Sequence, residues 1–123
     1  MRPRAPVRSA TMQSHFRLEV TSDDQTTLVT IAGELDLASS PALDEELQRL
    51  ASDGGGRVVI DLRELDFMDS TGLSTLVRAH GRLEQAGRPL GVVRGTPQVQ
   101  RLLELTGVAD RLELADAPEE FRA

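Results

Sequence analysis

A nearly continuous apolar run at residues 58–62, followed by an amphipathic stretch at residues 71–85, constrains the fold of this chain more than any other feature. Apolar residues that run without alternation are typical of a strand covered on both faces. The stretch that follows places Leu73, Leu76 and Val77 on one side of a helix. A buried strand that leads into a helix predicts an α/β fold with helices packed on a sheet.

The rest of the chain continues this alternation after an initial hairpin. We expect antiparallel strands at residues 15–20 and 26–32, joined by a turn at Asp23-Asp24. The further expected elements are a helix over residues 41–53 with Ser40 as its cap, a strand over 89–93, a helix from Thr96-Pro97 to Gly107, a strand over 112–114 and a helical turn over 118–121. This β-β-α-β-α-β-α-β order predicts a mixed sheet.

Length and composition indicate one domain with an aliphatic core. The 123 residues contain no Cys, so neither a disulfide framework nor a thiolate metal site is expected. The formal net charge is −6, and Phe is the one type of aromatic residue, which argues against nucleic-acid binding. No apolar run has the length of a membrane span, and we expect a cytoplasmic protein that does not insert into membranes.

The two ends of the chain are expected to lie outside the packed domain. Residues 1–13 contain Arg2, Arg4 and Arg8 and little apolar matter, so we expect a disordered basic tail there. Residues 118–123 are expected to form a C-terminal turn or tail. The domain itself is expected over residues 14–117.

The sequence offers little for catalysis. It lacks Lys, and therefore a phosphate-binding loop of the Gly-Lys type, and its two His residues are separated, which makes a zinc site improbable. A catalytic role for the hydroxyl of Ser70 would require a base to take its proton. His80 lies about 15 Å along the same helix, too far to act as that base. Asp36, Asp66 and Asp69 could gather Mg²⁺, but three surface residues at element ends are the favoured interpretation. We therefore expect no enzyme activity, no cofactor and no metal.

Three small polar residues, Asp69-Ser70-Thr71, stand at the start of the helix that follows the buried strand. Residues of these types usually cap a helix, and this interpretation is favoured on spacing alone. One cap residue would be enough, however, and no Glu or Gln completes a capping box. The alternative is a hydroxyl that is phosphorylated and dephosphorylated, because the amides of a first helical turn stabilise a phosphate.

Two motifs carry a resemblance to a known family. Gly33-Glu34-Leu35-Asp36 and Phe67-Met68-Asp69-Ser70-Thr71-Gly72-Leu73, at this separation, resemble the STAS domain of bacterial anti-sigma factor antagonists. The stretch Leu102-Leu103-Glu104-Leu105-Thr106-Gly107-Val108 is similar to the penultimate helix of that family. The resemblance implies a single domain with a mixed sheet of four or five strands and helices mainly on one face.

The resemblance also implies roles for single residues. Ser70 matches the phosphorylated serine, and Thr71 a second hydroxyl position that the family tolerates. Asp69 and Gly72 belong to the same motif, and Asp36 matches an acidic loop residue near the serine. Ser74 stands where many antagonists have a second Gly, which could alter how closely a partner approaches. Asp36, Asp69, Thr71, Gly72 and Ser74 are therefore the expected partner-binding residues.

The function implied by the resemblance is a partner switch in a bacterial stress response. The unphosphorylated protein would bind an anti-sigma factor that is also a serine kinase, phosphorylation of Ser70 would release it, and a PPM-type serine phosphatase would reset the switch. The alternative is a non-catalytic STAS subunit that docks on a transporter or a signalling assembly.

Overall fold

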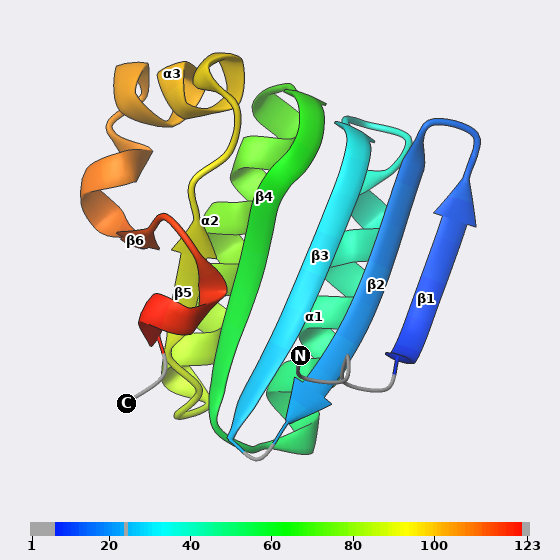
Figure 1. Cartoon of the computed structure of the whole chain (residues 1–123), viewed down its shortest axis with the longest axis vertical. Helices are drawn as coiled ribbons and strands as arrows, with labels where there is room; N and C mark the ends of the chain where they lie inside the picture. Colours follow the sequence, from blue (N-terminus) through cyan, green and yellow to red (C-terminus); the bar gives the residue numbers. More distant parts are fainter. Residues whose placement is uncertain (1–6, 24, 122–123) are drawn as a thin grey trace.

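One sheet of six strands, in the order β1-β2-β3-β4-β5-β6, forms the centre of the fold (Figure 1). The structure is a computed structural model and describes residues 7–23 and 25–121. The strands are β1 (Val7–Gln13), β2 (Phe16–Asp23), β3 (Thr26–Leu35), β4 (Arg57–Met68), β5 (Leu90–Val93) and β6 (Glu113–Ala115). The helices are α1 (Ser40–Asp53), α2 (Ser70–Gln85) and α3 (Pro97–Leu105), with short 3₁₀ helices η1 (Val108–Arg111) and η2 (Pro118–Phe121).

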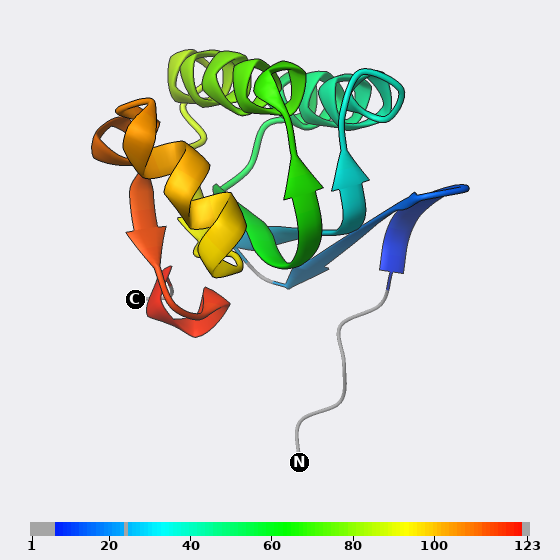
Figure 2. The ribbon, with the colours of Figure 1, turned by 90° about the horizontal axis from the view of Figure 1, so that it is seen from above.

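The sheet is mixed, as the element order predicts. β1, β2 and β3 pair antiparallel, whereas β3, β4, β5 and β6 pair parallel. Figure 2 shows α1 and α2 side by side over one face of the sheet and η2 near the other face. The predicted α/β class, with helices mainly on one face, is therefore confirmed, and six strands replace the expected four or five.

The additional strand is β1, which occupies part of the expected tail. The prediction of a disordered tail is wrong for Val7–Gln13, while residues 1–6 lie outside the described residues. Each side chain of β1 is exposed or half-buried, so the segment has no alternating apolar pattern that a sequence could reveal. It is held by backbone pairing with β2, from Val7 opposite Thr21 to Gln13 opposite Phe16.

The core is aliphatic and lies between the sheet and the helices. Its largest fully buried side chains include Ile31 of β3, Leu47 of α1, Ile60 of β4 and Leu76 of α2. Leu103 of α3 belongs to the same cluster, so the C-terminal elements share one core with the rest. None of the helices in the described ranges is long and apolar enough to span a membrane.

Several element boundaries differ from expectation. β4 continues beyond residue 62 to Met68, because it pairs with β3 along its whole length through two register shifts. Ser39, not Ser40, is the N-cap residue of α1, and Ser40 is buried in the first helical turn. α2 begins one residue earlier than expected, at Ser70.

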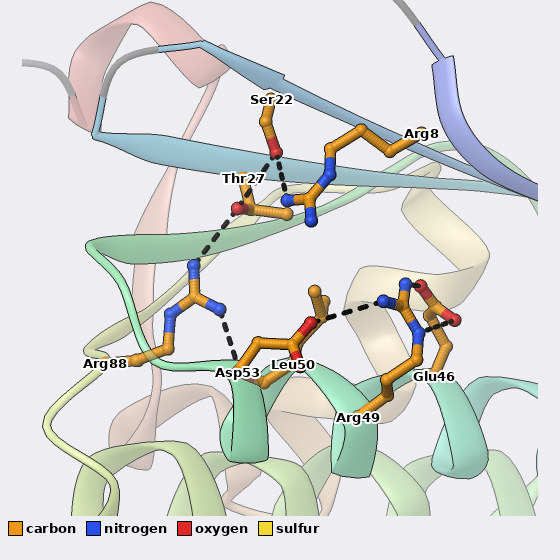
Figure 3. Close-up of polar contacts among 8 residues, drawn as sticks. All are labelled: Arg8, Ser22, Thr27, Glu46, Arg49, Leu50, Asp53 and Arg88. Carbon is orange, nitrogen blue, oxygen red and sulfur yellow. Dashed lines mark hydrogen bonds and ion pairs between the residues drawn. The ribbon is translucent and has the colours of Figure 1, made fainter.

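A buried arginine ties several elements together at the end of the sheet where β3 and β4 begin (Figure 3). Arg88, 3% exposed, donates to the carbonyl oxygens of Leu50 and Gly56, each at 2.8 Å, and to the Thr27 hydroxyl at 3.0 Å. Burial lowers the pKa of Arg88 from its ordinary value. Because Leu50 lies in the last turns of α1, the negative end of the helix dipole lies close to this charge.

Candidate functional site

Two loops meet at the opposite end of the sheet, where β3 and β4 end (Figure 1). Leu35 of β3 and Met68 of β4 are paired in parallel register, so the residues that follow each strand emerge at the same edge. The amide of Asp69 donates to the carbonyl oxygen of Leu35 at 3.2 Å. This bond joins the start of α2 to the β3–α1 loop. The carboxyl ends of parallel strands are where α/β proteins place their binding sites.

Asp69 alone provides the side-chain cap of α2. Its Oδ1 accepts a hydrogen bond from the amide of Gly72 at 3.0 Å, and its backbone is extended, as an N-cap requires. Ser70 is the first helical residue and is exposed, while Thr71 is half-buried. The cap therefore needs neither hydroxyl, and that of Ser70 lies at the surface beside the first amides of the helix.

Gly72 allows α2 to approach β3 closely. A Cβ atom at this position would lie 2.7 Å from the carbonyl oxygen of Leu35 and 2.8 Å from its Cγ, which no real contact tolerates. Gly72 is buried and lies in the helix, so the absence of a side chain matters here for space rather than for backbone conformation. Gly72 thus sets the position of the helix start that carries Ser70.

The β3–α1 loop is held by its own polar groups. Asp36 Oδ1 accepts the amides of Ala38 at 3.0 Å and Ser39 at 3.1 Å, which is an Asx turn. The Ser39 hydroxyl accepts the amide of Asp36 and donates to the carbonyl oxygen of Glu34 at 2.7 Å. The sequence favoured Ser40 as the cap of α1, and it gave no local signal that the Ser39 hydroxyl would hold the β3–α1 loop.

Gly33, near the end of β3, has a φ of +89°. A Cβ there would lie 2.2 Å from the carbonyl oxygen of His15, which instead accepts the amide of Glu34 at 2.7 Å. This close approach fixes the last residues of β3 before the loop. The first sequence motif therefore has a structural reason at Gly33 and at Asp36.

The structure gathers the predicted residues at one end of the molecule. Asp69, Ser70, Thr71 and Gly72 form the start of α2, and the Asp36 loop is hydrogen-bonded to it through Leu35. Ser74, one turn further along, is exposed. Among the described residues, no cluster of three or more His, Asp or Glu side chains could hold a metal ion.

Two apolar side chains at this end of the molecule are exposed, which the sequence did not predict. Leu37, in the β3–α1 loop, is 75% exposed, and Phe67, at the end of β4, is 41% exposed. A sequence does not distinguish them from core residues, because apolar residues at strand ends are usually buried. Phe67 belongs to the second sequence motif, whereas Leu37 has no such signal.

Comparisons with known proteins agree with this architecture. A family model described as "Mlab, STAS domain" matches residues 18–116. Proteins named anti-sigma-B factor antagonist, from Staphylococcus aureus strain NCTC 8325 and Bacillus subtilis strain 168, are each 30% identical over 105 residues; these cover 85% of this chain and 97% and 95% of the relatives. The crystal structure of an anti-sigma factor antagonist from Mycobacterium paratuberculosis superposes with a TM-score of 0.79 at 28% identity, covering 85% of this chain and 89% of the other.

Proposed function

Because this chain belongs to the STAS-domain family of anti-sigma factor antagonists, we propose that it binds an anti-sigma factor and is switched by phosphorylation of Ser70. In the unphosphorylated state it holds an anti-sigma factor with serine kinase activity, and a sigma factor is free. Phosphorylation releases that partner, and a PPM-type serine phosphatase restores binding. The protein performs no chemistry itself and acts in the cytoplasm, where transcription takes place.

The observation that carries this proposal is that the cap of α2 and the exposed hydroxyl at its start belong to different residues. Asp69 caps the helix, so the exposed hydroxyl of Ser70 has no part in the cap. A substituent on Ser70 would therefore leave the helix start intact. The amides of the first turn and the positive end of the helix dipole would stabilise a phosphate in the free protein. Thr71 is half-buried and less open to a kinase.

The charge around Ser70 explains why a partner would leave. Asp69 is adjacent to Ser70, and Asp36 lies in the loop that is hydrogen-bonded to the start of α2 through Leu35. A phosphate adds a charge of about −1.5 to −2 at neutral pH. An interface that accepts a neutral hydroxyl beside these carboxylates would then have to accommodate a larger negative charge, and affinity falls.

A titration with the anti-sigma factor tests this function. The partner is first captured from cells of the source bacterium with the unphosphorylated protein and identified by mass. We expect Ser70→Ala to bind like the wild type, and Ser70→Asp to bind about 10- to 100-fold more weakly, which is roughly 1.4–2.8 kcal/mol. The loss should shrink as salt rises, because exposed charges are screened. Ser52→Asp, at an exposed position near the C-terminal end of α1, is the matched control for the added charge.

Phosphorylation itself is measured with the captured kinase and ATP. Mass mapping should place the phosphate on Ser70, and Ser70→Ala should lose it while Thr71→Ala keeps it. Phosphate found chiefly on Thr71 would contradict the assignment. Phosphorylated protein that binds as tightly as unmodified protein would rule out the switch.

The second candidate is a non-catalytic docking subunit without a switch, because the description of the matching family model names a STAS domain and no phosphorylation. In that function, the same end of the molecule would attach to a transporter or signalling assembly. Ser70 would then remain unmodified in cells, and Ser70→Asp would leave partner capture unchanged. The identity of the captured partner and the modification state of Ser70 in cells therefore separate the two functions.

A further inference from the structure

Leu37 is an apolar side chain in a position where folding gives no reason for it. It is 75% exposed in the β3–α1 loop. Among residues 7–23 and 25–121, four other large apolar side chains are at least 41% exposed, namely Val7, Met12, Phe67 and Leu105. Of these five, Leu37 lies in the loop that is hydrogen-bonded to the start of α2 through Leu35.

The backbone around Leu37 is fixed before any partner arrives. Asp36 Oδ1 accepts the amides of Ala38 and Ser39, and the carbonyl oxygen of Asp36 accepts the amide of Ser40 at 2.8 Å. Leu37 lies within these closed turns, so its side chain projects from a rigid loop. A rigid loop loses little conformational entropy on binding, and a prepared apolar group therefore contributes more affinity.

Leu37 and Ser70 also belong to one rigid unit. The bond from the Asp69 amide to the Leu35 carbonyl lies one residue before Ser70 and two residues before Leu37. The tight contact of Gly72 with Leu35 keeps these segments together. A partner that covers the Ser70 hydroxyl therefore comes within reach of Leu37.

We infer that Leu37 is a specificity-determining anchor that inserts into an apolar pocket of the anti-sigma factor. This inference rests on the proposed function and adds a residue to it. Binding then has two separable parts. Leu37 contributes an apolar part that is insensitive to salt, and the charge state of Ser70 sets a part that salt weakens.

The test compares two leucines with the same exposure. Leu37→Ala and Leu105→Ala each remove a leucine side chain, exposed by 75% and 74% respectively, and Leu105 lies in the last turn of α3. Against the captured anti-sigma factor, calorimetry should show Leu37→Ala binding about 10- to 100-fold more weakly, roughly 1.4–2.8 kcal/mol, while Leu105→Ala binds like the wild type. Leu37→Met keeps a flexible apolar side chain and should stay within about threefold of the wild type.

Salt and stability distinguish an anchor from an indirect effect. The fold-loss of Leu37→Ala should be the same at low and high salt, whereas that of Ser70→Asp should shrink. The thermal midpoint of Leu37→Ala, followed by far-UV circular dichroism, should match the wild type, because an exposed side chain adds little to stability.

Each outcome decides between the two proposals. Wild-type protein that captures no anti-sigma factor overturns the proposed function, and this inference with it. Wild-type protein that binds, together with Leu37→Ala of equal affinity, overturns the anchor alone. An equal loss in Leu105→Ala also overturns the anchor, because the effect would then be general to exposed leucines.

Discussion

At the scale of single residues, the site depends on the space that Gly72 leaves for β3. The backbone of Leu35 lies against the first turn of α2, and it accepts the amide of Asp69 there. Gly72 therefore supports two neighbouring features. One is the helix cap formed by Asp69, in which Ser70 takes no part, and the other is the link to the loop that carries Leu37. Adding a side chain at Gly72 should therefore shift both the helix start and the loop.

Gly72→Ala should destabilise the protein by about 1–3 kcal/mol, because the new methyl group overlaps the Leu35 backbone and forces the helix start to shift. Gly81→Ala is the control in the same helix, where a Cβ atom would have no neighbour within 4 Å. That change should stabilise α2 by about 0.5–1 kcal/mol. Urea unfolding followed by circular dichroism measures both, and equal effects of the two substitutions would contradict the close-packing argument.

At the scale of elements, Arg88 holds the end of the sheet that lies far from Ser70. Its three hydrogen bonds reach α1 through Leu50, the residue before β4 through Gly56, and β3 through Thr27. The Thr27 hydroxyl is 3.2 Å from that of Ser22, which accepts from Arg8 of β1 at 2.9 Å. Figure 3 shows this chain of polar contacts running from the buried arginine to the edge strand.

Arg88→Met should cost about 2–4 kcal/mol of unfolding free energy. The substitution keeps most of the apolar volume but leaves buried carbonyl oxygens without their donor. Arg101→Met, at an exposed position on α3, is the matched control and should stay within about 0.5 kcal/mol of the wild type. Chemical denaturation gives both values. A neutral Arg88→Met would mean that water replaces the guanidinium at these carbonyls.

At the scale of the whole molecule, β1 extends the sheet beyond the hairpin of β2 and β3. It contributes backbone pairs to β2 and the Arg8–Ser22 hydrogen bond, but no fully buried side chain. Its contribution to stability should therefore be modest. Its larger effect should be to cover the edge of β2, since an open strand edge can pair with another chain.

Deleting residues 1–13 should lower the unfolding free energy by about 1–2 kcal/mol relative to a chain that lacks residues 1–6, a size typical of the loss of a few packed contacts. The shorter chain should also associate more, as measured by light scattering after gel filtration, because the β2 edge is open. If the two shortened chains had the same unfolding free energy and the same state of association, residues 7–13 would behave as the disordered tail that the sequence predicted.

The sequence alone determined the parts of this fold that depend on neighbours along the chain. The alternation of strands and helices, the core leucines of α1 and α2, and the placement of Asp69-Ser70-Thr71 at a helix start all follow from period and capping. The two motifs also carried the family, and the comparisons confirm it. These features are local, so they can be predicted without knowing which residues pack against them.

Tertiary structure decided what depends on residues far apart in the chain. Arg88 meets Thr27 across 61 positions, and β1 has no pattern of its own and exists because β2 offers a strand edge. The contact of Gly72 with Leu35 and the exposure of Leu37 both arise where the ends of β3 and β4 meet. Whether a side chain is buried, or a hydroxyl is left unused, is a property of that meeting and cannot be read from local periodicity.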